Sequence, residues 1–202
     1  MLVIACNTAT AVALEEISQQ LDIPVVGVIL PGTRGAVKAS KNQRIGVIGT
    51  LGTIKSQSYE QAIRSRDLNA HVISLACPKF VPLVESNQYQ SPIAKKVVAE
   101  TLVPLQNKKI DTLILGCTHY PLLRPIIQNV MGRQVKLIDS GAETITEVSM
   151  LLDYFKLGNL YATKTGELTC YTTGSTKLFD EIANEWLQGP TIASKHIQLG
   201  DE

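Results

Sequence analysis

The 202-residue sequence has no apolar run that approaches the ~20 residues needed to span a membrane. Its amino terminus has neither the basic segment nor the long apolar segment of a secretory signal peptide. The formal net charge of +1 at pH 7 is too small to favour nucleic acid or an acidic membrane surface as a partner. We therefore expect a cytoplasmic protein that binds neither nucleic acid nor membranes.

Paired cysteine motifs are also absent. The four cysteines, Cys6, Cys77, Cys117 and Cys170, are widely spaced, and no Cys-x-x-Cys occurs. This spacing argues against a disulfide framework and against a thioredoxin-like site, so the thiols are expected to be reduced. We predict no metal site, because Cys117 and His119 offer only two ligands and no second cluster has zinc-like spacing.

What the sequence does contain is an alternation of strand-like and helix-like segments. Nearly continuous apolar runs, typical of parallel strands covered on both faces, predict strands at residues 2–6, 25–29, 44–50, 70–76, 112–117, 135–139 and 168–173. Helical patterns predict helices at residues 9–21, 54–66, 93–105, 122–131, 142–155 and 177–187. The alternation predicts an α/β fold with mostly parallel, doubly wound sheets.

Two of the predicted strand ends carry similar polar motifs. Cys6 is followed by Asn7 and Thr8, and Cys117 is followed by Thr118 and His119. In a doubly wound sheet, ligands bind just beyond the carboxyl ends of the strands, which is where both cysteines fall. Each motif is expected to lead into a helix, whose N-terminus favours a thiolate and attracts a carboxylate.

The duplication of the motif is what favours chemistry over a structural role. A single cysteine at a strand end is more often a small buried hydrophobe than a catalyst. Two cysteines in matching polar settings favour acid/base work, since a free thiol has a pKa of ~8.5 and needs little help near neutrality. His119 is placed to assist proton transfer at Cys117.

The remaining cysteines and histidines lack such settings. Cys77 and Cys170 are expected in the core. His71 and His196 are expected at the surface or at strand ends.

Four longer motifs can be read along the chain. Two of them are Val-Ile-Ala-Cys-Asn-Thr-Ala-Thr-Ala around Cys6 and Leu-Gly-Cys-Thr-His-Tyr-Pro-Leu-Leu around Cys117. The others are Gly-Val-Ile-Gly-Thr-Leu-Gly-Thr, which ends at Thr53, and Ala-Cys-Pro-Lys-Phe-Val-Pro-Leu-Val-Glu, which ends at Glu85. These four motifs, in this order, resemble those of the glutamate racemases, a branch of the aspartate/glutamate racemase family, and the similarity extends over nearly the whole chain.

The resemblance implies two pseudo-symmetric lobes with the active site in the cleft between them. The first lobe would consist of residues 1–30 and 139–202, and the second of residues 31–138. A homodimer is possible, as for other members of the family.

The resemblance also implies a mechanism and a biological role. Cys6 and Cys117 would each remove or return the α-proton of glutamate, on opposite faces of the α-carbon and without a cofactor. The product D-glutamate would serve peptidoglycan synthesis in the cell wall. The residues that match substrate contacts or positions near the site are Asn7, Thr8, Thr118, His119, Thr53 and Glu85.

The family pattern also includes an Asp-Ser-Gly motif and a Tyr-Gly pair before the first cysteine, and neither is present here. About two βα units, at ~30 residues each, are therefore expected to be missing, which would leave the first lobe truncated at its N-terminus. The run Asp139-Ser140-Gly141 follows the second cysteine motif and precedes a helix. In the family, the aspartate of the Asp-Ser-Gly motif assists the first cysteine, and we interpret Asp139 as a helix N-cap rather than as a substitute for that aspartate.

Other functions remain open at this stage. The chain could be an inactive, truncated remnant that acts as a binding or regulatory domain. A cysteine hydrolase that uses Cys117 and His119 is a weaker alternative, because it would not require the duplicate site at Cys6. Aspartate racemisation is a neighbouring activity within the same class.

Overall fold

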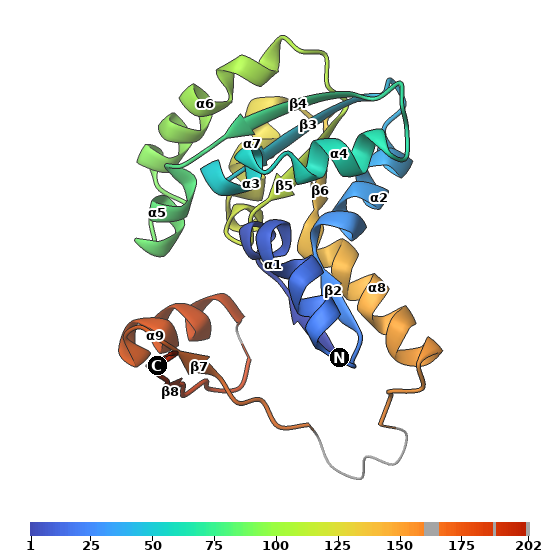
Figure 1. Ribbon diagram of the computed structural model, residues 1–202. Helices are drawn as coiled ribbons and strands as arrows, with labels where there is room; N and C mark the ends of the chain where they lie inside the picture. The colour runs from blue at the N-terminus through green and yellow to red at the C-terminus, as the bar shows by residue number, and fades with distance from the viewer. Residues whose placement is uncertain (160–165, 188, 201–202) are drawn as a thin grey trace. The chain divides into compact units, whose positions relative to one another are not determined.

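The computed structural model describes residues 1–159, 166–187 and 189–200 (Figure 1). Residue contacts divide the chain into two compact units, Met1–Leu157 and Gly158–Glu202. Among the helices that the described ranges contain, none combines the length and the hydropathy of a membrane span. The division into lobes of residues 1–30 with 139–202 and of residues 31–138 stays a prediction.

The first unit alternates strands and helices, as the sequence predicts. Its strands are β1 (Leu2–Ile4), β2 (Val25–Gly27), β3 (Arg44–Gly49), β4 (His71–Ala76), β5 (Thr112–Gly116) and β6 (Lys136–Asp139). Its helices are α1 (Asn7–Gln20), α2 (Ile29–Ala39), α3 (Leu51–Lys55), α4 (Ser58–Arg64), α5 (Phe80–Glu85), α6 (Pro92–Gln106), the 3₁₀ helix η1 (Tyr120–Leu123), α7 (Arg124–Met131) and α8 (Ser140–Tyr154). Every strand pair in this unit is parallel, so the predicted α/β class is confirmed.

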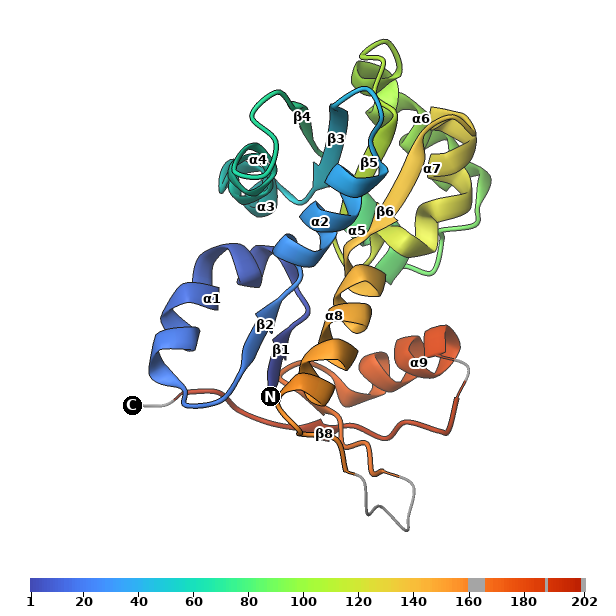
Figure 2. The same ribbon diagram turned by 90° about the vertical axis from the view of Figure 1, so that its right-hand side faces the viewer.

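A four-stranded sheet in the order β4-β3-β5-β6 is the centre of the first unit. Helices α2 and α4 cover one face, and α6 and α7 cover the other (Figures 1 and 2). Strand β5 is buried along its whole length, as a central parallel strand should be. Because β3 and β5 pair in register with Gly49 opposite Gly116, their carboxyl ends lie side by side.

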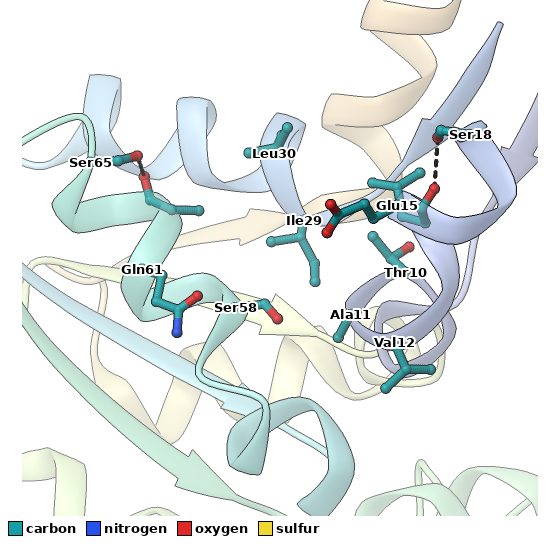
Figure 3. Close-up of a pocket in the computed structure, with 12 residues that line it drawn as sticks. Thr10, Ala11, Val12, Glu15, Ser18, Ile29, Leu30, Ser58, Gln61 and Ser65 are labelled. Carbon is teal, nitrogen blue, oxygen red and sulfur yellow. Dashed lines mark hydrogen bonds between the residues drawn. The ribbon is translucent and has the colours of Figure 1, made fainter.

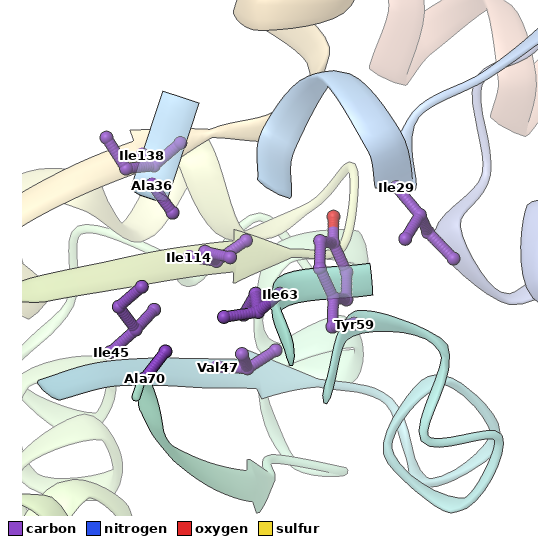
Figure 4. Close-up of a cluster of buried hydrophobic side chains, with 9 residues drawn as sticks. All are labelled: Ile29, Ala36, Ile45, Val47, Tyr59, Ile63, Ala70, Ile114 and Ile138. Carbon is purple, nitrogen blue, oxygen red and sulfur yellow. The ribbon is translucent and has the colours of Figure 1, made fainter. Parts of the chain in front are cut away.

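The core between this sheet and helices α2 and α4 is a cluster of buried side chains (Figure 4). Alternate residues of β3 and single residues of β5 and β6 contribute to it, which is the period-2 pattern of a strand. Full burial of one such aliphatic side chain stabilises the fold by about 1.5–3 kcal/mol. The members are Ile29, Ala36, Ile45, Val47, Tyr59, Ile63, Ala70, Ile114 and Ile138.

Strands β1 and β2 form a separate parallel pair, with α1 on one side and α8 on the other (Figure 2). The prediction that every strand is covered on both faces is wrong for β1. Leu2 and Val3 are 37% and 39% exposed. Within the described residues, β1 pairs with β2 alone.

Three helices differ from the prediction. The helix expected at residues 54–66 is divided into α3 and α4, because Gln57 adopts a left-handed conformation with φ 56°. Helix α5 was not predicted at all. Helix α2 was missed as well, because it contains Pro31, Gly32 and Gly35, which are poor helix formers.

The glycines of α2 permit close packing against α8. A Cβ added at Gly32 would lie 3.0 Å from Cβ of Ser140, and one added at Gly35 would lie 2.6 Å from Cδ of Glu143. Arg34 of α2 also forms a salt bridge with Glu147 of α8. The glycines that weaken the helical pattern of α2 in the sequence are therefore the residues that allow α2 to pack closely against α8.

The second unit contains β7 (Tyr171–Thr172), α9 (Thr176–Leu187) and β8 (Lys195–His196), and its two strands are parallel. The strand predicted at residues 168–173 is thus shorter than expected, whereas the helix at 177–187 is confirmed. Cys170 is half-buried rather than in the core, and His196 is exposed as expected.

Candidate active site

Cys6 lies where β1 ends and α1 begins. It is the N-cap residue of α1, and its Sγ accepts a hydrogen bond from the backbone N–H of Ala9 at 3.5 Å. The sulfur is exposed and sits at the positive end of the helix dipole, which favours a negative charge there. Sequence analysis predicted this position at a helix N-terminus, and the structure confirms it.

Cys117 follows directly after β5 and is only 7% exposed. Burial raises the pKa of its thiol, and the backbone N–H of His119 partly opposes that effect. A negative charge on Cys6 raises the pKa of Cys117 further, because the two sulfurs interact. The expected α-helix does not follow at once, since the chain first forms the 3₁₀ helix η1 from Tyr120.

A cavity of about 190 Å³ brings the two cysteine motifs together. Its size is below that of drug-sized ligand pockets and suits a small molecule of amino-acid dimensions. The residues that line it are Cys6, Asn7, Thr8, Thr50, Val81, Gly116, Cys117, Thr118 and His119. The predicted site residues from both motifs therefore share one cavity, while Thr53 and Glu85 lie outside its lining.

His119 connects Cys117 with Glu85. Its Nδ1 lies 3.8 Å from Sγ of Cys117 and 3.3 Å from Oγ1 of Thr118. Its Nε2 lies 3.2 Å from Oε1 of Glu85. When Nε2 carries the proton, it donates to the carboxylate, and Nδ1 faces the thiol as an acceptor. Glu85 thus contacts His119 and does not itself line the cavity.

Three threonine hydroxyls, one of them from the first motif, form a triangle. Oγ1 of Thr8 lies 2.8 Å from that of Thr50 and 3.0 Å from that of Thr53, and the last two are 3.1 Å apart. Thr50 is also the N-cap of α3. Thr53 is 2% exposed, and its hydroxyl is within hydrogen-bond distance of both of the others.

Sequence analysis named neither Thr50 nor Val81 as a site residue, although both line the cavity. Thr50 stands at the end of β3, in one of the quoted motifs, and that strand-end position was the signal that could have revealed it. Val81 lies in the unpredicted helix α5, and although it belongs to the quoted motif that ends at Glu85, it is an apolar residue with no strand-end position to mark it.

Asp139 is the N-cap of α8, as predicted, and its Oδ1 accepts hydrogen bonds from the backbone N–H groups of Gly141 and Ala142. It does not line the cavity between the cysteines. Cys77 is fully buried, and burial raises the pKa of its thiol to about 12, so its predicted structural position is confirmed. His71 is exposed at the start of β4, as predicted.

A larger pocket of about 640 Å³ lies between α1, α2 and α4 (Figure 3). Glu15 is the ionisable residue in its lining, among side chains such as Val12, Ile29 and Gln61. None of the residues predicted from the sequence lines this pocket. In the described part of the chain, no three His, Cys, Asp or Glu side chains gather closely enough to hold a metal ion.

The protein is thus an enzyme of parallel α/β fold with two thiols at strand ends around one small cavity. Similarity to known proteins identifies its family. The sequence profile described as Asp/Glu/Hydantoin racemase matches residues 1–148. The chain is 67% identical over 200 residues to a glutamate racemase of Enterococcus faecalis, a match that covers 99% of this chain and 73% of the relative.

Solved structures give the same result. The structure of glutamate racemase isoform RacE1 from Bacillus anthracis matches with a TM-score of 0.91 and 42% identity, over 98% of this chain and 73% of that one. A glutamate racemase from Francisella tularensis in complex with D-glutamate matches with a TM-score of 0.89 and 31% identity, over 97% of this chain and 72% of that one. The chain belongs to the Asp/Glu/Hydantoin racemase family and is an isomerase of the amino-acid racemase class.

Proposed function

We propose that the chain interconverts L- and D-glutamate by a two-thiol acid/base mechanism that needs no cofactor. The observation that carries the proposal is the shared cavity, in which Cys6 and Cys117 approach one space from two different strand ends. The Francisella tularensis relative binds D-glutamate, and an Escherichia coli relative binds L-glutamate, so both enantiomers are proposed as substrates here.

The reaction exchanges one proton at the α-carbon. The thiolate of one cysteine takes the α-proton and becomes a thiol, and the carbanion receives a proton from the thiol of the other cysteine on the opposite face. That second cysteine ends as the thiolate, so the two exchange roles when the direction reverses. His119, held by Glu85, accepts or returns the proton of Cys117 between turnovers.

The polar neighbours of the cysteines supply substrate contacts. Asn7, Thr8 and Thr118 line the cavity and offer amide and hydroxyl groups to the ammonium and carboxylate groups of an amino acid. Such preorganised donors stabilise the negative charge that develops when the α-proton leaves. We further propose that the D-glutamate enters peptidoglycan synthesis in the cytoplasm, and that the lobes and the homodimer named above describe the assembled enzyme.

Polarimetry tests the proposal directly. Incubation with either pure enantiomer of glutamate is expected to bring the optical rotation to zero, and aspartate is expected to react more slowly. An ester-hydrolysis assay run in parallel tests the cysteine-hydrolase alternative, which predicts ester cleavage without racemisation. The inactive-remnant alternative predicts neither reaction, and the high identity to glutamate racemases does not favour it.

A further inference from the structure

The ring of Tyr59 is buried beside the strand that leads to Cys117. The residue is 2% exposed and belongs to the core cluster (Figure 4), where its hydroxyl oxygen is turned away from Val47. A Cβ added at Gly116 would lie only 3.2 Å from Cε2 of the ring. Because Gly116 directly precedes Cys117, the ring of Tyr59 packs against the backbone that carries one thiol.

The hydroxyl of Tyr59 reaches the motif of the other thiol. It donates a 2.6 Å hydrogen bond to Oδ1 of Asn7, which directly follows Cys6 and is itself 2% exposed. Burial raises the pKa of Tyr59 well above its ordinary value, so the hydroxyl keeps its proton at working pH. Gly32 provides the space, since a Cβ there would lie 3.2 Å from the hydroxyl.

Ser140 also contacts the side chain of Asn7. Nδ2 of Asn7 lies 3.4 Å from Oγ of Ser140, and that hydroxyl lies 3.3 Å from the carbonyl oxygen of Leu115 in β5. Oγ of Ser140 lies 3.4 Å from Oδ1 of Asn7 as well, so the short hydrogen bond from Tyr59 to Oδ1 is the contact that fixes the amide. Tyr59 also packs against Gly116, and Ser140 also contacts Leu115, so both residues connect Asn7 with the end of β5.

We infer that Tyr59 is a positioning residue for racemisation, which couples the placement of Asn7 and Cys6 to that of Cys117. The inference rests on the proposed function and deepens it. The side chain of Tyr59 contacts Asn7, which follows Cys6, and Gly116, which precedes Cys117. A base that is misplaced by about 1 Å can lose about 10²-fold in rate, so a fixed spacing between the two thiols has a direct kinetic consequence.

The test is Tyr59→Phe, which keeps the ring in the core and removes only the hydroxyl. We expect kcat for glutamate racemisation to fall by about 10-fold to 10²-fold, because Asn7 loses its short hydrogen bond. The matched control is Tyr120→Phe. Tyr120 is also fully buried, and its hydroxyl donates to the carbonyl oxygen of Cys77 at 2.9 Å, away from Asn7. The control is expected to lose similar thermal stability and to keep a kcat within about 2-fold of the wild type.

A double-mutant cycle separates positioning through Asn7 from a general structural effect. Asn7→Ala is expected to lose activity, and adding Tyr59→Phe to it should cause no further loss. If Tyr59→Phe lowers kcat by the same factor in both backgrounds, or no more than Tyr120→Phe does, the inference is overturned. Should Tyr59→Phe not fold, Ser140→Ala takes its place in the cycle, with the same two outcomes.

Assay of the wild-type chain distinguishes a failure of the proposed function from a failure of the role inferred for Tyr59. Absence of racemisation by the wild type would remove the proposed function itself. A racemising wild type together with a fully active, folded Tyr59→Phe variant would remove only the role of Tyr59.

Discussion

The thiols of Cys6 and Cys117 border one cavity of about 190 Å³, and a negative charge on Cys6 raises the pKa of Cys117. Two thiols that interact in this way resist being ionised together, because each charge disfavours the other. One thiolate facing one thiol is also the arrangement that proton removal on one side and proton return on the other requires. The electrostatics of the site and the proposed mechanism therefore agree.

Replacement of either cavity thiol should abolish racemisation. Cys6→Ser and Cys117→Ser each leave one acid/base group, and such groups are typically worth ~10²–10⁴ in rate. Serine is a far weaker base than a thiolate, so kcat for both enantiomers should fall at least by that factor. Polarimetry and chiral chromatography measure the loss.

Cys77→Ser is the matched control for these two changes. Cys77 is fully buried and absent from the cavity lining, so racemisation should persist. A polar group in this apolar setting should lower the free energy of unfolding by about 1–3 kcal/mol. Loss of turnover in Cys77→Ser with retained turnover in Cys6→Ser would show that the bases are wrongly assigned.

The rate should depend on pH through the pair of thiols. Burial raises the pKa of Cys117 above its ordinary value, so this thiol is mostly protonated at pH 7. The active state has one thiolate and one thiol, so we expect kcat/KM to rise with pH as the pair loses its first proton and to fall at higher pH as Cys117 also ionises. A profile that does not change between pH 6 and pH 10 contradicts an acid/base role for the pair.

Glu85→Gln should affect catalysis through His119. The glutamine keeps the length of the side chain but removes the charge that faces Nε2 of His119, 3.2 Å away. We expect kcat to fall by about 10-fold to 10²-fold with a smaller change in KM, since Glu85 does not line the cavity. An equal loss in a His119→Asn background would show that Glu85 acts independently of the imidazole.

Asp111 should make stability depend on acid pH. Burial alone would raise the pKa of its carboxyl, but hydrogen bonds from Ser40 and from the backbone N–H groups of Asn42 and Lys41 lower it overall. A lowered folded-state pKa contributes stability above the unfolded value of ~3.9, and that contribution is lost as pH falls through the folded value.

The corresponding measurement is denaturant unfolding of Asp111→Ala and the wild type at several pH values. We expect the variant to be about 1–2 kcal/mol less stable at pH 7. The difference should shrink below about pH 4, as the wild-type carboxyl becomes protonated. A difference that stays constant down to pH 2 would contradict this assignment.

The strands and the cysteine motifs could be predicted because their signals are local. The apolar run Leu-Ile-Leu of β5 is short and nearly continuous, which is typical of a buried parallel strand, and the polar motif that begins with Cys117 follows it directly. Helix α2 could not be predicted, since its glycines reduce helix propensity and are explained only by contact with α8, more than one hundred residues away in the sequence.

The support for the site was equally hard to foresee. Tyr59 has the sequence setting of an ordinary helical core residue, and its hydrogen bond to Asn7 depends on the packing of α4 against two strand ends. Ser140 stands next to a helix N-cap, which was a sufficient explanation for it from the sequence alone. Long-range contacts of this kind leave no local pattern.

Isotope exchange in D₂O tests the two-thiol mechanism most directly. The wild-type chain is incubated with one pure enantiomer of glutamate, and both enantiomers are analysed by chiral chromatography and mass spectrometry before one tenth has reacted. The returning proton comes from a thiol that exchanges with solvent, so the account predicts deuterium at the α-carbon of the product and almost none in the remaining substrate. A product that retains the original α-proton would contradict it.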